Sequence, residues 1–143
     1  MTRDIMVARW TEVGDKLVAL AEEFPEERYD VRPAPDVRSF AEQLRHVAFW
    51  NEYARKALRG EKADGSANEL PAATYATKKK LVRVLRESLD GVKAELANGN
   101  GKAPADAAVD TVVSSIEHNG EHYGQLVVYS RLAGLVPPAS RSA

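Results

Sequence analysis

The stretch MVARWTEVGDKLVALAEEF, residues 6–24, decides the fold class of this chain. Its apolar residues recur at alternating spacings of four and three, which places them on one face of an α-helix. We predict a helix over residues 3–24 that ends before Pro25, because the residue preceding a proline avoids helical geometry. The apolar stripe consists of Met6, Trp10, Val13, Leu17, Leu20 and Phe24.

Three further helices follow from the same periodicity. We predict them over residues 39–59, 75–97 and 107–132. Ser39 and Glu42 have the spacing of a capping box at the start of the second helix. Gly60 is a C-terminal stop for that helix, and Thr74 is a candidate cap for the third.

The connections between these helices limit the topology. The first, residues 25–38, is proline-rich, although its Tyr29 and Val31 can pack against the helices. The second, residues 60–74, is polar, and both are long enough to cross from one end of a bundle to the other. The third is NGNGKAPAD, residues 98–106. We predict an all-α four-helix bundle formed by one domain over residues 1–143, with the order of neighbouring helices open.

The composition excludes several classes of protein. Twenty basic and 21 acidic residues among 143 give a net charge of −1, without the basic excess that is typical of nucleic-acid-binding domains. The chain has no cysteine, so it has no disulfide, thiolate ligand or thiol nucleophile of its own. No apolar run is typical of a secretory signal or a membrane span. We expect a cytoplasmic protein that binds neither nucleic acid nor membranes.

The candidate functional residues are the three histidines. His118 and His122 lie in HNGEH, residues 118–122, and residues four apart share one face of a helix. On a helical wheel they share a column with Thr111, Gln125 and Tyr129. This column holds no charged residue, which is unusual for a face in water.

His46 is the third histidine and lies on the second predicted helix. It shares its side of that helix with Trp50 and Tyr53, at the border of the core. The charged residues that we expect on the opposite, solvent-facing side are Arg45, Glu52 and Lys56. Three imidazoles would suit zinc, nickel, copper or iron.

Spacing alone leaves two interpretations open. The histidines are either the ligands of a divalent ion or ordinary residues at the edge of the core. The motif is not the HExxH sequence of zinc proteases, because position 119 is Asn and the usual general base is absent. Gly120 and Gly124 lie on another face, where we expect close approach of a second helix, within the bundle or from a second subunit.

The order of these motifs resembles the DinB family, the DinB/YfiT-like metal-dependent enzymes. The resemblance rests on RPAPDVRSFAEQLRHV (residues 32–47), the His-x-x-x-His pair and HYGQLVVYSRLAGLVPP (residues 122–138). It implies a four-helix bundle with a long crossover between helices two and three, and commonly a homodimer. It also implies a divalent ion, often nickel or zinc, held by His46, His118 and His122. Relatives include transferases and isomerases that use low-molecular-weight thiols, proteins described as hydrolases, and stress-inducible proteins.

Two functions are therefore weighed. In the first, the chain is a metal-dependent enzyme of the thiol-dependent transferase or isomerase type, or of the hydrolase type. Gln125 and Tyr129 can orient a ligand or the histidines, and Trp50 and Tyr53 can wall the cavity, but no catalytic residue is identified. A cysteine-free enzyme of this kind would use a low-molecular-weight thiol as cosubstrate. In the second, the chain is a non-catalytic, metal-stabilised, dimeric binding or stress-response protein.

Overall fold

The computed structural model describes residues 3–98 and 105–141, and these residues form four long helices without a strand. The helices are α1 (Arg3–Glu23), α2 (Phe40–Leu58), α3 (Lys78–Asn98) and α4 (Ala105–Leu132), with short 3₁₀ turns at Glu26–Arg28 and Pro138–Ser140. All four predicted helices are confirmed. The predicted break at residues 98–106 falls mainly on 99–104, outside the described residues.

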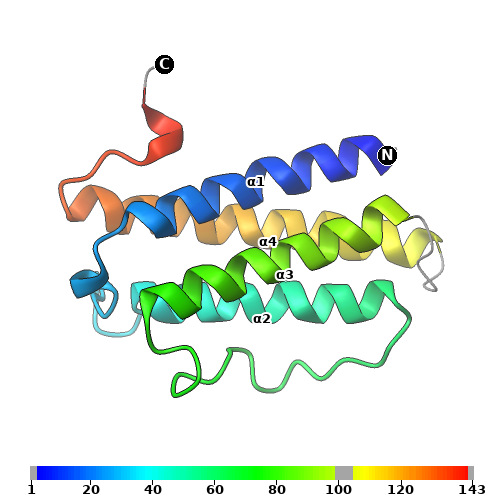
Figure 1. Cartoon of the computed structure of the whole chain (residues 1–143), viewed down its shortest axis with the longest axis horizontal. Coiled ribbons are helices and arrows are strands. Elements are labelled where there is room, and N and C mark those ends of the chain that lie inside the picture. Colours follow the sequence, from blue (N-terminus) through cyan, green and yellow to red (C-terminus); the bar gives the residue numbers. More distant parts are fainter. Residues whose placement is uncertain (1–2, 99–104, 142–143) are drawn as a thin grey trace.

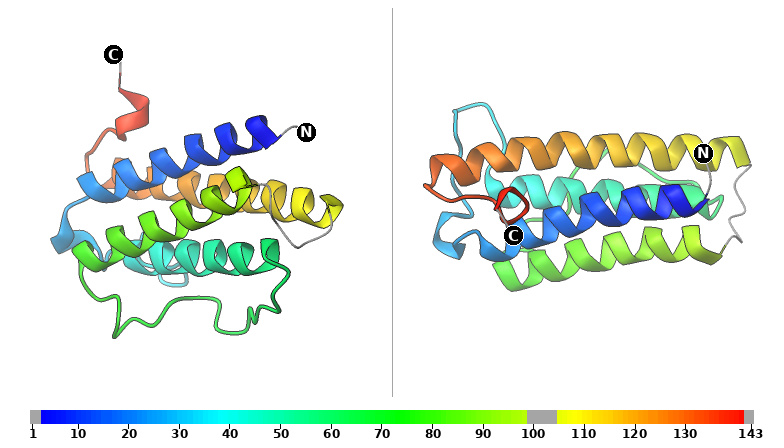
Figure 2. Two further views of the ribbon diagram at one scale, coloured as in Figure 1. Left: turned by 45° about the vertical axis from the view of Figure 1, so that its right-hand side comes forward. Right: turned by 90° about the horizontal axis from the view of Figure 1, so that it is seen from above.

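The helices form a bundle in which α2 and α3 run in the same direction. Figure 1 shows α1 and α4 running one way along the long axis and α2 and α3 running the other way. Helix α2 packs against α3 and α4, and α1 packs against the same two helices. Residues 59–77 make this arrangement possible, because they travel the length of the bundle before α3 begins (Figures 1 and 2). The long crossover between the second and third helices is confirmed. Residues 24–39 form no crossover, because they join the end of α1 to the neighbouring start of α2.

The start of α2 is fixed by the predicted capping box. Ser39 Oγ accepts from the backbone N–H of Glu42 at 3.2 Å, and the Ser39 N–H donates to the Glu42 carboxylate at 3.1 Å. Arg32 forms an ion pair with the same carboxylate and ties the first connection to the helix. The helix ends at the predicted glycine, since Gly60 has a φ of 72°, a left-handed conformation that costs glycine little.

The predicted start of α3 was wrong by one turn. The backbone N–H groups of Thr74 and Tyr75 both donate to the carbonyl of Pro71, so these residues form a separate turn. Thr77 takes the capping position that we assigned to Thr74, and its hydroxyl accepts from the N–H of Lys80 at 3.3 Å.

The core joins all four helices through the predicted apolar stripes. Trp10 is buried between α1 and α3, and its indole N–H donates to the carbonyl of Leu89 at 2.9 Å. The rings of Phe24 and Phe40 stack at a centroid distance of 3.9 Å, which holds the end of α1 against the start of α2. Tyr29 is buried beside them as expected, whereas Val31 is 43% exposed because its connection turns away from the bundle.

Among the described residues, no helix combines the length and the apolar character that crossing a bilayer requires.

Candidate metal centre

The three histidines meet between α2 and α4. Nε2 of His46 lies 3.0 Å from Nε2 of His118, and one ring nitrogen of each histidine lies within 4.8 Å of those of the other two. His46 is 6% exposed and His122 is 8% exposed, while His118 is half-buried. The helical spacing of the pair on α4 and the antiparallel packing of α2 against it bring the rings together.

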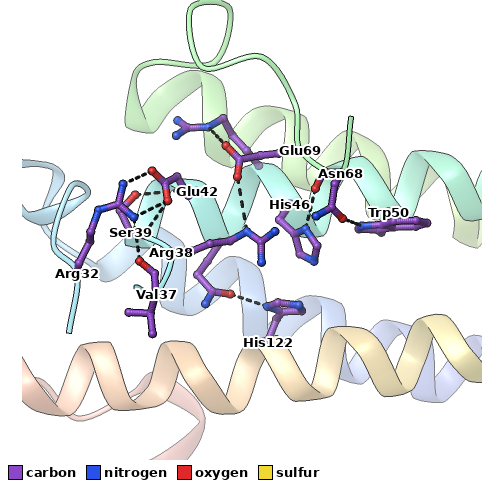
Figure 3. A network of polar contacts seen from close by, with 12 residues as sticks. Arg32, Val37, Arg38, Ser39, Glu42, His46, Trp50, Asn68, Glu69 and His122 are labelled. Atoms are coloured by element: carbon purple, nitrogen blue, oxygen red, sulfur yellow. Dashed lines mark hydrogen bonds and ion pairs between the residues drawn. The ribbon is translucent and has the colours of Figure 1, made fainter. Parts of the chain in front are cut away.

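The crossover fixes the orientation of His46. Nδ1 of its ring lies 2.7 Å from the backbone carbonyl oxygen of Asn68 (Figure 3). A carbonyl only accepts, so Nδ1 carries the proton and Nε2 presents a lone pair toward His118. Asn68 has a φ of 59°, and its side chain accepts from the indole N–H of Trp50 at 2.8 Å. Asparagine tolerates this left-handed conformation better than most residues, but nothing in the sequence singles out this position.

A chain of hydrogen bonds, in which each donor and acceptor can be assigned in only one way, fixes the tautomer of His122. The Tyr129 hydroxyl donates to the backbone carbonyl of Arg38, so its oxygen accepts from the Gln43 amide group, 3.4 Å away. The Gln43 NH₂ group also donates to Gln125 at 2.7 Å, so the amide oxygen faces His122. Nδ1 of His122 lies 2.5 Å from that oxygen and must donate to it, which leaves Nε2 of His122 unprotonated.

Gln125 and Tyr129 therefore reach His122 through Gln43. The sequence did not identify Gln43 as part of the site. The sequence did hold a signal for it. Gln43 is a neutral polar residue one helical turn before His46, and it lies on the face of α2 whose other residues are mostly apolar and buried. Metal-ligating histidines usually donate their second ring N–H to an oxygen that orients the ring, as His46 and His122 both do here.

The electrostatic surroundings keep the imidazoles neutral. Burial lowers the pKa of His46 to about 4 and that of His122 to about 3. Burial also lowers the pKa of His118, although the Asn119 amide and the Glu121 carboxylate oppose this shift. The guanidinium of Arg38 lowers the pKa of all three further. Neutral imidazole is the form that binds metal ions.

The crossover also buries a charge that we expected on the surface. Arg45 is only 8% exposed, which corrects the prediction that it faces solvent with Glu52 and Lys56. Its Nε lies 3.3 Å from the carboxylate of Glu69, and its guanidinium donates to the carbonyl of Tyr75 at 3.2 Å. Glu69 also lies 3.6 Å from Nε of Arg38 (Figure 3). The crossover thus covers this side of α2, and its Glu69 carboxylate partly balances the positive charges of Arg38 and Arg45.

The donor set fits a divalent transition-metal ion. Bonds from zinc to imidazole nitrogen are about 2.0–2.1 Å long, so two ligands at the tetrahedral angle lie about 3.3 Å apart. The His46 and His118 nitrogens, 3.0 Å apart, are close to that spacing. His46 and His122 are held with Nε2 free, and all three rings are neutral at pH 7. Because Nε2 of His118 donates to Nε2 of His46, an ion bound by all three rings would replace this one hydrogen bond, with the His118 proton moved to Nδ1, and would leave the hydrogen bonds to Asn68 and Gln43 intact.

A cavity of about 310 Å³ lies beside His118, between α2 and α4. Trp50 and Tyr53 line it from α2, with their ring centroids 4.8 Å apart. Residues of α4 from Asp110 to His118 form the opposite wall. The cavity is large enough for a small organic molecule that reaches the histidines from this side.

Asn119, which stands where zinc proteases have their glutamate, belongs to a buried network. It is fully buried, and its NH₂ group donates to the side chain of Asn51 at 3.0 Å. Asn51 donates to Ser88 at 3.1 Å, and the Ser88 hydroxyl donates to the carbonyl of Leu85. This network joins α4, α2 and α3 directly beneath the histidines.

The two glycines of α4 do not mark close packing inside the bundle. A Cβ atom built on Gly120 or Gly124 meets no other atom within 4 Å. This overturns the first of the two explanations that we considered, because both residues face outward while the neighbouring helices contact other faces of α4. Close approach of a second subunit stays a prediction.

The fold and the histidine geometry agree with a comparison against models of protein families. Residues 9–126 match the model of the DinB superfamily. No curated protein matches the chain. The match covers well over half of the 143 residues and includes all three histidines. The chain therefore belongs to the DinB superfamily.

Proposed function

We propose that the chain is a metal-dependent enzyme in which His46, His118 and His122 hold one divalent ion, nickel or zinc. The observation that carries this proposal is the direction of two hydrogen bonds. His46 donates to Asn68 and His122 donates to Gln43, so both rings turn an unprotonated Nε2 toward the third histidine. A buried structural histidine also needs an acceptor for its ring N–H, but it does not need its unprotonated nitrogen to converge with those of two other histidines.

An ion held by three neutral imidazoles keeps its full charge and supplies Lewis acidity, which lowers the pKa of a bound water or thiol toward neutrality. The protein's own residues position and enclose the site. Asn68 and Gln43 keep two rings in place, and Trp50 and Tyr53 wall the cavity beside His118. Gln125 and Tyr129 act on His122 through Gln43.

Two reaction classes fit this site. In a thiol-dependent transferase or isomerase, a small thiol cosubstrate enters from the cavity, because the chain has no cysteine. In a hydrolase, water takes the same place. We favour the thiol-dependent class because Asp110, the one carboxylate among the described residues that line the cavity, is exposed and stands more than two helical turns from His118, too far to serve as a general base there.

The experiment is a transfer screen with nickel- and zinc-loaded protein. Glutathione, mycothiol and bacillithiol are each supplied with a panel of electrophilic acceptors, and loss of free thiol is followed. Metal-dependent turnover that disappears in the His118→Ala variant is expected. Metal-loaded protein that neither binds a thiol nor turns over in this screen or in a parallel ester and amide hydrolysis screen would overturn the proposal.

A second candidate, a non-catalytic metal-stabilised homodimer with a binding or stress-response role, is favoured by the outer face of α4. Gly120 and Gly124 have open space around them, and Val113 and Val128 nearby are exposed. Because a side chain at Gly124 meets nothing within the chain, Gly124→Arg should leave the monomer folded. A dimer in analytical ultracentrifugation that becomes a monomer in this variant supports the homodimer, and a monomeric wild-type protein rejects it.

A further inference from the structure

The cavity beside His118 has two chemically different walls. Trp50 and Tyr53 present aromatic rings from α2. The α4 wall is polar and includes Asp110, Ser114 and Ser115. None of the described residues that line the cavity is Lys or Arg.

The hydrogen-bond donors of this lining are mostly in use. The Ser114 hydroxyl lies 2.8 Å from the backbone carbonyl of Asp110, and that of Ser115 lies 2.6 Å from the carbonyl of Thr111. A carbonyl only accepts, so both hydroxyls donate their protons to their own helix and turn lone pairs outward. The Trp50 indole N–H is likewise bound, to Asn68. The polar wall therefore offers mainly acceptors to a ligand.

The negative charge lies at the far end of the cavity from the histidines. Asp110 is exposed and precedes His118 by eight residues, which corresponds to roughly 12 Å along the helix axis. Trp50 and Tyr53 line the space between, and aromatic faces attract cations. A carboxylate, hydroxyl lone pairs and aromatic rings together select a donor-rich, positively charged group and repel an anion.

We propose that this cavity binds a substrate whose reactive group reaches the histidines and whose tail carries an ammonium group, which lies against Asp110. This inference rests on the proposed function, because it assumes that a ligand reaches a metal ion from the cavity. It adds the substrate class: an aliphatic amine or amino compound with its cationic group about seven bonds or more from the atom that binds the ion. An extended chain of this length, together with an ammonium–carboxylate contact of about 2.8 Å, covers the roughly 12 Å of wall.

The test uses three thiols of equal length with different tails. Protein loaded with Co²⁺ is titrated with 6-aminohexane-1-thiol, 6-mercaptohexan-1-ol and 6-mercaptohexanoate, and binding is followed by the change in cobalt absorption as sulfur binds. The amine is expected to bind roughly fivefold to tenfold more tightly than the carboxylate, with the alcohol between them, because an exposed ion pair contributes up to about 1 kcal/mol. Cysteamine, whose amine does not reach Asp110, should show no such advantage over 3-mercaptopropionate.

Two charge-removing variants of α4 make the test specific. Asp110→Asn should abolish the preference for the amine. Glu117→Gln is the matched control, because Glu117 is exposed and closer to His118 in sequence but does not line the cavity; it should keep the preference. Equal affinities for the three long thiols, tighter binding of the carboxylate, or a preference that persists in Asp110→Asn would overturn this inference alone. No binding of any thiol would instead contradict the open metal site on which the proposed function rests.

Discussion

Nδ1 of His122 lies 2.5 Å from the amide oxygen of Gln43, and the backbone carbonyl of Arg38 determines the direction of this hydrogen bond through Tyr129. The loop before α2 thus decides which nitrogen of a histidine on α4 is free. Metal affinity should accordingly depend on residues that never touch the ion.

Gln43 provides the first test of this dependence. Gln43→Leu removes the oxygen that orients His122, and we expect a loss of about 10–100-fold in metal affinity. Gln43→Glu keeps an acceptor at the same place and should retain affinity near that of the wild type. Competition with a chromophoric chelator measures both, and a Gln43→Leu variant that binds as tightly as the wild type would refute the role of Gln43.

Asn68 tests the contribution of the crossover. Its backbone carbonyl holds His46, so the conformation of this residue matters more than its side chain. Asn68→Gly adopts a φ of 59° without strain and should bind metal almost normally. Asn68→Val disfavours that conformation by about 1–2 kcal/mol and should weaken binding. Equal affinities of the two variants would show that the carbonyl of residue 68 does not position His46.

The metal-free protein should lose stability as the pH falls below about 6.5. The pKa values of His46 and His122 are lowered to about 4 and about 3 in the fold, so between these values and 6.5 the unfolded chain binds more protons. Their contribution is complete above pH 6.5 and declines as the pH drops toward 4. We expect the free energy of unfolding to fall by roughly 2–4 kcal/mol between pH 7 and pH 5.

Urea unfolding of the metal-free protein at several pH values measures this decline. The double variant His46→Gln, His122→Gln supplies the control, because it keeps the carboxylates that also titrate in acid. Its stability should change much less between pH 7 and pH 5, and identical pH profiles for the two proteins would exclude the histidines as the cause.

The network beneath the histidines should contribute to stability more than to metal binding. Asn51 accepts from Asn119 and donates to Ser88, so Asn51→Leu leaves the buried NH₂ group of Asn119 without its partner, while Ser88 keeps its hydrogen bond to the Leu85 carbonyl. Asn119→Leu leaves the Asn51 oxygen unpaired but also removes the Asn119 amide oxygen, which is buried and has no partner, so the number of unsatisfied groups does not rise. With about 1–3 kcal/mol for each unsatisfied group, Asn51→Leu should be the more destabilising variant in thermal or urea unfolding. Equal losses would contradict this assignment of the unsatisfied groups.

The helices and the His118–His122 pair could be predicted because their signals are local, whereas the third ligand, His46, followed only from the resemblance to the DinB family. The apolar stripe from Met6 to Phe24 and the four-residue spacing of His118 and His122 both depend on helix geometry alone. The burial of Arg45 could not be predicted, because it depends on the path of residues 59–77, which have no periodicity. The same holds for Asn68, whose role lies in its backbone. Gln43 is an intermediate case. The sequence places it on the core face of its helix, but it does not show that Gln43 contacts His122 on α4.

The central claim, that the three histidines hold one metal ion, is tested most directly by elemental analysis of purified protein after reconstitution with nickel or zinc and dialysis against a weak chelator. Wild type and Glu117→Gln should each retain about one ion per chain. His118→Ala should retain far less while unfolding at a similar temperature when metal-free. Equal metal content in wild type and His118→Ala would contradict the three-histidine centre.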